Sequence, residues 1–435
     1  MAHYRINGGK KLNGKISISG SKNAAVAIIP AVILCGKKCT LKNIPDIDDV
    51  RKLILLLESI GAKVEFDTQQ NIMTVDPSGI SSTELTGDLM RELRASYYFL
   101  GALLGKYGKA KLALPGGCSI GKRPIDIHIS GMEALGVEVK LDKVKNTITA
   151  FSKNNNGELF CSSGSIKLQK RSVGGTINIM MAAAAAKYNE TVIRNAAKEP
   201  HVVDVANFLN AMGANITGAG TDTITIRPTN EWHGCTYEII PDQIETGTYM
   251  IAAAAAGGRV TLCNVIPKHM EALTQVLLKC GVGITKYSDD ERDYITIDSK
   301  GKGLSAAEVV TEPYPGFPTD LQQPLVALLA AANGQSIVRE EIFEARFAYV
   351  EQLNLMGASI KVLEDNRLAV INGVGTLKAQ NVIVPDLRAG AALIVAALMA
   401  EGESNIYDIQ YLDRGYEKLD SKLKGVGADI TRIED

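Results

Sequence analysis

The stretch LESIGAKVEF, residues 57–66, contains the pattern that decides the fold: the end of an apolar helix, a glycine, a small residue and a strand. Apolar residues three and four apart before the glycine are typical of one helix face, and the alternation after it is typical of a strand with one exposed face. A repeat of this pattern every 68 to 77 residues is too long for a solenoid and predicts one small α/β subdomain in six copies. The other five copies are MEALGVEVKL (132–141), FLNAMGANIT (208–217), LLKCGVGITK (277–286), LNLMGASIKV (353–362) and LKGVGADITR (423–432).

Each copy also contains an alanine-rich segment that is apolar on nearly all sides. Such a segment predicts a helix that is buried on most of its faces, and its small side chains allow close packing. We therefore expect an α/β protein of two domains, each with three subdomains, whose strands lie outside and whose alanine-rich helices pack inside. The predicted inner helices cover residues 24–35, 95–105, 176–187, 246–257, 321–333 and 389–400.

The domain boundaries follow from breaks between the copies. A proline in Ile240-Pro241-Asp242 separates the third copy from the fourth, and a second crossing is expected near Gly20-Ser21-Lys22. We expect an N-terminal domain over residues 22–240 and a C-terminal domain that combines residues 1–21 with residues 241–435. The active site is expected in the cleft between these domains.

Composition excludes several classes of function. The 435 residues carry a net charge of −1, which gives no global argument for a nucleic acid or an acidic membrane as partner, so any anion binding must be local. The segment MAHYRINGGKKLNG does not resemble an export signal, and no window approaches the roughly 18 apolar residues of a membrane span, so we expect a cytoplasmic protein. The seven cysteines are scattered without a CxxC pair, which favours reduced thiols over a disulfide framework or a zinc site.

A glycine-rich loop contains the first candidate catalytic residue. The segment PGGCSIGKRPID, residues 115–126, places Cys118 shortly before Lys122 and Arg123. Two nearby cations favour thiolate over thiol, and the glycines permit backbone conformations that suit a moving loop. The segment predicts a reactive thiol beside an anion site. The alternative is that Cys118 is a small buried apolar residue, as most free cysteines are.

Basic residues stand near the predicted starts of four alanine-rich helices. They are Lys22 for the first helix, Arg94 for the second, Lys170 for the third and Arg388 for the sixth. Helix N-termini offer unpaired N–H groups and a positive dipole end, so a cation there suits a phosphate or carboxylate. We expect the four starts to converge in one anion-binding cleft. A solvated lysine before a helix is the alternative for Lys22.

Asp320 follows a rigid segment, EPYPGFPT, at the start of the fifth alanine-rich helix. In a cleft of positive charge, a single carboxylate is a candidate general base. The alternative role is an N-cap, which is worth about 1 kcal/mol. The five histidines are dispersed and predict no metal site, and His128 is interpreted as an ordinary polar residue.

Eight motifs, in order along nearly the whole chain, resemble the UDP-N-acetylglucosamine 1-carboxyvinyltransferase family: SGSKNAA, LPGGCSIGKRPIDIH, KRSVGGT, PDQIETGTY, EPYPGFPTD, FEARF, DLRAG and DRGYE. The resemblance implies the inside-out α/β barrel that this family shares with the shikimate-pathway enolpyruvyl transferase. It implies transfer of the enolpyruvyl group of phosphoenolpyruvate to the 3-hydroxyl of UDP-N-acetylglucosamine, with release of phosphate, as the first committed step of peptidoglycan synthesis. It implies no cofactor or metal and no nucleic-acid or membrane partner, and it leaves the oligomeric state open.

The resemblance also implies residue roles. Cys118 would donate a proton to the methylene carbon and would be the cysteine that fosfomycin alkylates. Asp320 would orient or deprotonate the sugar hydroxyl, and Lys22, Arg123 and Arg388 would hold phosphoenolpyruvate. The substrate-binding set is Lys22, Asn23, Arg94, Arg123, Pro124, Ile125, Asp126, Ile127, Lys170, Arg171, Ser172, Val173, Asp320, Ile342, Arg346 and Arg388.

Two departures and two alternatives accompany the resemblance. Gln243 stands where some members have arginine, and Lys122 stands where other members have a neutral residue. Transfer to shikimate 3-phosphate on the same fold is one alternative, but that family lacks the PGGC loop. A non-catalytic UDP-sugar-binding regulator is the other, and it would not need to keep Cys118, Lys22 and Asp320 together.

Overall fold

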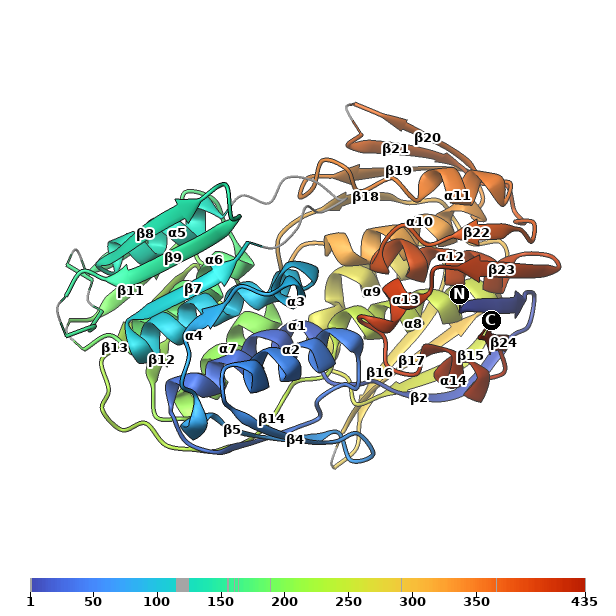
Figure 1. Cartoon of the computed structure of the whole chain (residues 1–435). Coiled ribbons are helices and arrows are strands. Elements are labelled where there is room, and N and C mark those ends of the chain that lie inside the picture. The colour runs from blue at the N-terminus through green and yellow to red at the C-terminus, as the bar shows by residue number, and fades with distance from the viewer. Residues whose placement is uncertain are drawn as a thin grey trace. The chain divides into compact units, whose positions relative to one another are not determined.

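A computed structural model describes residues 2–114, 125–154, 156–159, 161–162, 164–187, 189–290, 292–364 and 366–434. The chain divides into two compact units. The N-terminal unit contains the described residues from Gly20 to Ile240, and the C-terminal unit contains those before Gly20 and after Ile240. Within the described residues each unit forms three four-stranded sheets around its inner helices (Figure 1).

The three copies in the N-terminal unit follow the predicted succession of inner helix, strand, amphipathic helix and hairpin. The first has α1 (Lys22–Ala31), β3 (Cys39–Lys42), α2 (Asp48–Ser59), β4 (Lys63–Asp67) and β5 (Ile72–Asp76). The second has β6 (Glu84–Leu85), α3 (Asp88–Glu92), α4 (Tyr98–Tyr107), β7 (Lys109–Ala113), α5 (Asp126–Ala134), β8 (Val137–Asp142) and β9 (Thr147–Ser152). The third has β10 (Ser165–Lys167), α6 (Val173–Ala184), β11 (Thr191–Arg194), α7 (Pro200–Ala211), β12 (Asn215–Thr217) and β13 (Thr223–Arg227), and β14 (Thr236–Glu238) follows it.

The C-terminal unit repeats this succession. Its first copy has α8 (Gln243–Ala256), β15 (Gly258–Cys263), α9 (Glu271–Lys279), β16 (Gly283–Ser288) and β17 (Asp293–Ser299). Its second has β18 (Glu308–Thr311), α10 (Gln322–Ala330), β19 (Gln335–Glu340), α11 (Val350–Leu355), β20 (Ser359–Leu363) and β21 (Leu368–Asn372). Its third has β22 (Asn381–Ile383), α12 (Leu387–Met399), β23 (Glu403–Tyr407), α13 (Gln410–Asp413), α14 (Leu419–Gly425) and β24 (Asp429–Ile433), and the N-terminal strands are β1 (His3–Asn7) and β2 (Leu12–Ser17).

The repeated glycines end the amphipathic helices, as the sequence predicts. All six have a positive φ, between 76° and 107°, which a residue with a side chain rarely adopts. They are Gly61, Gly136, Gly213, Gly281, Gly357 and Gly427.

Two strands are exchanged between the copies. In four sheets, a short edge strand that precedes the inner helix runs parallel to the strand that follows it, as β10 does beside β11. The strand β2 precedes α1 but pairs with β15 of the fourth copy, whereas β14 precedes α8 but pairs with β3 of the first copy. The strand β1 completes the sixth sheet between β23 and β24. One sheet of the C-terminal unit is thereby completed by β2, which directly precedes the N-terminal unit in sequence. One sheet of the N-terminal unit is completed by β14, which directly precedes the C-terminal unit in sequence.

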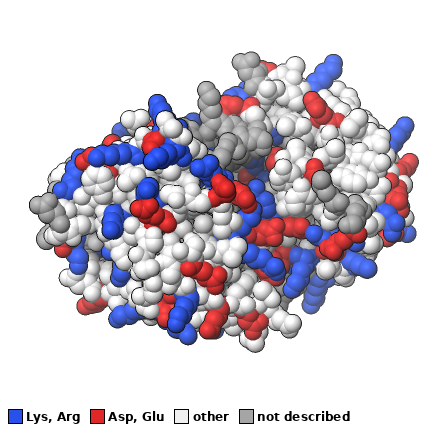
Figure 2. Space-filling view, viewed as in Figure 1, with Lys and Arg blue, Asp and Glu red and all other residues white. Residues whose placement is uncertain are grey.

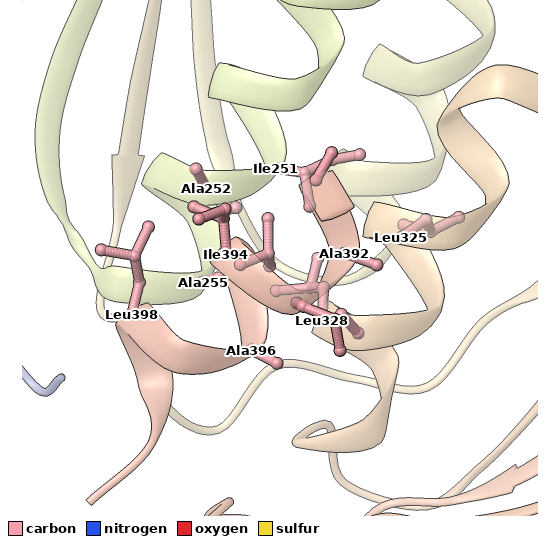
Figure 3. Packing of buried hydrophobic residues seen from close by; sticks show 14 of the residues in the cluster. Ile251, Ala252, Ala255, Leu325, Leu328, Ala392, Ile394, Ala396 and Leu398 are labelled. Carbon is pink, nitrogen blue, oxygen red and sulfur yellow. The ribbon is translucent and has the colours of Figure 1, made fainter. Parts of the chain in front are cut away.

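Small residues form the contacts between inner helices. In the C-terminal unit α8, α10 and α12 pack against one another, and Figure 3 shows Ala252, Ala255, Ala392 and Ala396 among larger residues such as Leu325. In the N-terminal unit α4 packs on α1 and α6. The predicted architecture of outer sheets and buried alanine-rich helices is confirmed.

The predicted helix ends need correction. The helix α1 begins at Lys22, two residues before the predicted start, and α6 begins at Val173, three residues before it. Both begin directly after a capping serine, so the hydrogen-bonded helix starts earlier than the apolar run that marked it in the sequence. The helix α10 ends at Ala330, before the predicted residue 333. Among the described residues, no helix has the length and hydrophobicity to cross a membrane.

The close contact between α4 and α6 gives a stability prediction. A Cβ on Gly101 of α4 would lie 2.5 Å from the backbone oxygen of Asn178 in α6. We expect Gly101→Ala to lower the free energy of unfolding by about 1–3 kcal/mol through overpacking, although alanine favours an isolated helix by about 1 kcal/mol. The control is Gly425→Ala in α14, where a Cβ meets nothing within 4 Å and a small gain is expected. Equal urea-unfolding midpoints for the two variants would contradict this reading of the packing.

Candidate active site

A polar or charged residue stands at or near the start of each inner helix. Side chains cap four of them: Ser21 for α1, Ser172 for α6, Asp242 for α8 and Asp386 for α12. The other two follow 3₁₀ turns, η3 (Arg94–Tyr97) before α4 and η5 (Thr319–Leu321) before α10. Because packing of the apolar helix bodies fixes these ends, the candidate residues next to them are fixed as well.

In the C-terminal unit, Asp320 lies between two arginines. Its Oδ2 is 3.0 Å from Nη2 and 3.1 Å from Nε of Arg388, and its Oδ1 accepts a hydrogen bond from Arg346. The arginine side chains are only 7% and 2% exposed, against 27% for Asp320. The structure therefore brings three predicted site residues, from η5, α12 and the loop after β19, into one ion-paired group.

Asp320 is not a helix cap. The turn η5 has Pro318 at its N-cap position and no side-chain capping bond, and α10 follows Leu321 without one. The alternative role that the sequence allowed for Asp320 is therefore wrong, because its carboxylate is turned to the arginines instead.

A buried glutamate orders the surroundings of Asp320. Glu340, fully buried at the end of β19, accepts a hydrogen bond from Oγ1 of Thr319 at 2.9 Å. Its other oxygen accepts from the backbone N–H of Ile342 at 2.9 Å and of Phe343 at 3.1 Å. One carboxylate thus joins the turn that carries Asp320 to the loop that carries Ile342 and Arg346. The sequence analysis missed this residue, since only the fold brings these segments together.

Arg388 keeps its charge despite its burial. Burial is the largest influence and lowers the pKa of this guanidinium, but Asp320, Tyr416 and Asp242 together raise it by more, so the net direction is upward. Nη1 donates to the Tyr416 hydroxyl at 3.4 Å, and that hydroxyl is 2.9 Å from Oγ1 of Thr248. Tyr416 lies in the DRGYE motif and was not predicted as a site residue.

One arginine of this group retains an unused donor. Nε of Arg346 is buried and has no hydrogen-bond partner among the described residues. A buried N–H without an acceptor costs about 1–3 kcal/mol. An anionic oxygen is the acceptor that a guanidinium binds most strongly, so this atom indicates anion binding.

In the N-terminal unit, Lys22 is the first residue of α1. Its Nζ lies 2.8 Å from Oδ2 of Asp49, which is in the first turn of α2 and is almost fully buried. Asn23 follows it at the same helix end and is partly exposed. Asp49 holds the lysine at the start of α1, so the alternative of a freely solvated lysine is wrong. Sequence reasoning missed Asp49, although two acidic residues at a helix start were visible.

The starts of α5 and α6 lie side by side. A Cβ on Gly175 would be 2.7 Å from Ile127, and one on Gly174 would be 3.1 Å from the ring of His128. Predicted site residues Asp126 and Ile127 therefore lie close to Ser172 and Val173. Ile125 immediately precedes α5. Lys170 is exposed beside this group, whereas Nε of Arg171 is buried and has no partner among the described residues.

His128 is held in a defined tautomer. The backbone N–H of Gly101 donates to Oδ1 of Asn178 at 2.8 Å, so Nδ2 is the amide group that faces the Tyr97 carbonyl and Nδ1 of His128, each at 3.0 Å. Nδ1 of His128 is therefore an acceptor, and the proton is on Nε2. Burial, followed by the charge of Arg94, lowers the pKa of His128 to about 4. His128 is thus a neutral, hydrogen-bonded polar residue beside the start of α6, and its interpretation as an ordinary polar residue stays a prediction.

Several predicted residues lie outside the described part of the chain. They are Cys118, Lys122, Arg123 and Pro124, all from the PGGC loop. Gln243 is described as the first residue of α8, and its buried Oε1 has no partner among the described residues. No group of three or more His, Cys, Asp or Glu residues in the described ranges is placed to hold a metal ion.

The candidate cations differ from the ordinary surface charges. Figure 2 shows Lys and Arg mixed with Asp and Glu over the visible face, without one dominant field. Arg346, Arg388 and Lys22 are mostly buried and are each paired with a carboxylate. Buried, paired cations thus stand at the starts of α1 and α12 and in the loop after β19.

The chain is similar to enolpyruvyl transferases over its whole length. Residues 6–423 match the family described as EPSP synthase (3-phosphoshikimate 1-carboxyvinyltransferase). A protein of Clostridium botulinum named UDP-N-acetylglucosamine 1-carboxyvinyltransferase is 48% identical over 434 residues, which is 100% of both chains. One of Clostridium acetobutylicum, named UDP-N-acetylglucosamine 1-carboxyvinyltransferase 2, is 49% identical over 98% of both chains.

Solved structures share the fold. The enolpyruvyl transferase NikO from Streptomyces tendae aligns with a TM-score of 0.85 at 24% identity, covering 99% of this chain and 98% of that one. EPSP synthase from Acinetobacter baumannii aligns over 100% of both chains with a TM-score of 0.74 at 16% identity. These likenesses show the inside-out arrangement of α/β subdomains and nothing about the substrate.

The fixed tautomer of His128 gives a pH prediction. In the unfolded chain the ring titrates near its ordinary value of about 6.5, whereas the folded protein lowers its pKa to about 4. The unfolded state therefore binds the proton first, and stability is lost as the pH falls from about 6.5 towards 4, by up to about 1.4 kcal/mol per pH unit. In His128→Asn, whose Oδ1 can accept from Asn178, this loss should be absent. Urea unfolding of both proteins at several pH values is the measurement, and parallel stability curves would contradict the prediction.

Proposed function

The chain belongs to the EPSP synthase family and, within it, to the UDP-N-acetylglucosamine 1-carboxyvinyltransferases, and on that premise we propose its reaction. It transfers the enolpyruvyl group of phosphoenolpyruvate to the 3-hydroxyl of UDP-N-acetylglucosamine and releases phosphate. The observation that carries this proposal is the buried Asp320–Arg346–Arg388 group, because it offers a carboxylate for a hydroxyl proton beside guanidinium groups for an anion.

The C-terminal unit supplies the groups for the attack. A carboxylate oxygen of Asp320 accepts the proton of the sugar 3-hydroxyl as that oxygen bonds to C2 of phosphoenolpyruvate. Arg388 holds the phosphate or carboxylate of phosphoenolpyruvate, and Arg346 directs its spare Nε towards a substrate anion. The two arginines fix the direction of the Asp320 carboxylate before substrate arrives, which reduces reorganisation during the reaction.

The N-terminal unit supplies the second set of anion-binding groups. Lys22, held by Asp49, binds phosphoenolpyruvate together with Asn23. Arg94, Lys170, Arg171 and the N–H groups at the start of α6 bind the diphosphate of the UDP-sugar. The family motif also assigns Ile125 to Ile127, and Ile342, to the UDP-sugar.

The PGGC loop supplies the acid. We assign to Cys118 the proton that reaches C3 of phosphoenolpyruvate, and to Arg123 a substrate phosphate; these two roles rest on the family motif. Addition gives a tetrahedral ketal, and loss of a C3 proton and of phosphate from this ketal gives the enolpyruvyl ether. No step requires a metal or an organic cofactor.

The comparisons favour this acceptor over shikimate 3-phosphate. The relatives named for UDP-N-acetylglucosamine are 46–49% identical over nearly the whole chain, whereas the EPSP synthase structures are 16% identical. An acceptor with a diphosphate also fits the cations and N–H groups at the start of α6. A non-catalytic regulator would have no use for a carboxylate that two buried arginines orient.

Phosphate release tests the acceptor. The purified protein should release phosphate from phosphoenolpyruvate when UDP-N-acetylglucosamine is present, and should do so in EDTA. Shikimate 3-phosphate in place of the UDP-sugar is the control and should give no release above background. Equal turnover with both acceptors, or loss of activity in EDTA, would refute the proposal.

Asp320→Asn tests the base. The variant keeps the shape and one acceptor oxygen but loses the basic carboxylate, so kcat should fall by about 10²–10⁴-fold while binding of UDP-N-acetylglucosamine changes less. The matched control is Asp413→Asn: Asp413 lies in the same unit, its side chain is also 27% exposed, and Arg432 binds it at 2.8 and 2.9 Å. The control should keep its kcat, and near-normal kcat in Asp320→Asn would assign Asp320 a structural role.

A further inference from the structure

Three cysteines of the N-terminal unit gather at one end of β3, outside the proposed active-site groups. Cys35 follows the 3₁₀ turn η1 (Val32–Leu34) at the end of α1, Cys39 begins β3, and Cys235 directly precedes β14. The sulfur atoms of Cys35 and Cys39 are 3.7 Å apart, and Sγ of Cys39 lies 3.8 Å from Sδ of Met212. The first two cysteines are 4% and 1% exposed, whereas Cys235 is partly exposed.

Strand pairing places Cys39 directly beside Cys235. Thr40 of β3 is the partner of Thr236 in the parallel β14, and its N–H donates to the Cys235 carbonyl at 2.9 Å. One residue earlier on each strand stand the two cysteines, whose side chains therefore point to the same face. Neighbouring strands are about 4.8 Å apart, within the roughly 4.4–6.8 Å between Cα atoms that a disulfide spans. From the register one residue later we infer that the Cα atoms of Cys39 and Cys235 lie within the range that a disulfide spans.

Hydrogen bonds among the thiols make the three cysteines unequal. The hydrogen bond from Cys39 lowers the pKa of Cys235, and the same bond raises the pKa of Cys39 to about 11. The hydrogen bond with Cys39, and then burial, raises the pKa of Cys35. Cys235 is therefore the most acidic thiol of the three, and it is also the one that solvent reaches most readily.

We propose that Cys235 and Cys39 form a site of reversible oxidation by peroxides, with Cys235 as the reacting thiol and Cys39 as the resolving thiol. The Cys235 thiolate attacks one peroxide oxygen, the O–O bond breaks, and the hydroxide that leaves takes a proton to become water. The Cys39 sulfur then attacks the sulfenic acid of Cys235, an S–S bond forms, and its oxygen leaves as a second water. Two thiols thus lose two electrons, and one peroxide becomes two waters. A low-pKa, accessible cysteine beside a second thiol is the usual arrangement of such sites.

The bridge would act on the exchanged strand. Because β14 has three residues and lies at a sheet edge, few hydrogen bonds hold it to β3. A disulfide between residues 39 and 235 closes a loop that covers most of the N-terminal unit, and a long closed loop restricts the unfolded chain strongly. The oxidised protein should therefore unfold at a higher temperature than the reduced protein.

Peptide mapping tests the site. The full chain is treated with one equivalent of hydrogen peroxide, free thiols are alkylated, and the protein is digested without reductant. We expect a linked pair of peptides containing Cys39 and Cys235, lighter by two hydrogen atoms than the separate peptides and lost after reduction. The unfolding temperature should rise with formation of this pair and return on reduction.

Variants separate the proposal from general oxidation. Cys235→Ser should abolish both the link and the rise in unfolding temperature. Cys39→Ala should leave Cys235 oxidised to a sulfenic or higher acid without a link, so two independent variants test the proposal. Cys35→Ala and Cys263→Ser should keep the link; Cys263, on β15 of the other unit, is the matched control because it is also partly exposed. A Cys35–Cys39 link, oxidation of Cys263 before Cys235, or oxidised Cys235 without a link in the wild type would overturn the proposal.

Discussion

Close approach of the inner helices is the constraint on which the rest of this structure depends. A Cβ on Gly247 of α8 would lie 2.3 Å from Leu321, and Gly101 of α4 allows no Cβ beside Asn178 of α6. Helices this close must have alanine and glycine at their contacts, so the middle of each helix has little room for large polar or charged side chains. Polar and charged residues are therefore found at the helix starts. Rigid packing along the helix bodies then fixes the positions of those starts, which is the condition that a preorganised site requires.

The exchange of β2 and β14 creates two chain crossings, and buried polar groups hold one of them. In the C-terminal unit the Ser19 N–H donates to Glu245 at 2.7 Å, its hydroxyl donates to Glu417 at 2.6 Å, and its carbonyl accepts from the N–H of Asp242 at 2.9 Å. Lys422 forms an ion pair with Glu245, which partly offsets the rise in the pKa of Glu245 that burial causes. A buried ion pair of this kind contributes little net stability. A chain path that separated Lys422 from Glu245 would, however, leave a buried charge without a partner, which is strongly unfavourable. The edge strands β2 and β14 have only six and three residues, so a fixed point of entry helps each of them to pair in the correct register.

The sequence predicts the elements with a repeated local signal and misses the contacts that only tertiary structure creates. Six helix-ending glycines and six alanine-rich runs are visible without a structure, so the α/β copies and their inner helices are predictable. Asp320, Lys22 and Arg388 are predictable as candidates because each is a charged residue near the start of an otherwise apolar, alanine-rich helix. Their partners are not, since Asp49 lies 27 residues after Lys22 and the role of Glu340 arises from two segments about 20 residues apart. The roles of Cys118 and Arg123 remain predictions from the motif.

The arginine pair changes what a carboxylate at position 320 contributes. Two guanidinium groups that are almost fully buried cannot remain charged without compensation, because desolvation of each costs several kcal/mol. Asp320 therefore stabilises the folded site and offers a proton acceptor with the same two oxygens. A bound anion can compensate part of the arginine charge in place of Asp320, since it brings negative charge to the same two guanidinium groups. When it does, the Asp320 carboxylate is less strongly held by its partners and becomes more available as a base. In the reaction proposed above, substrate binding and activation of the base would thus be coupled through the charge balance of three side chains.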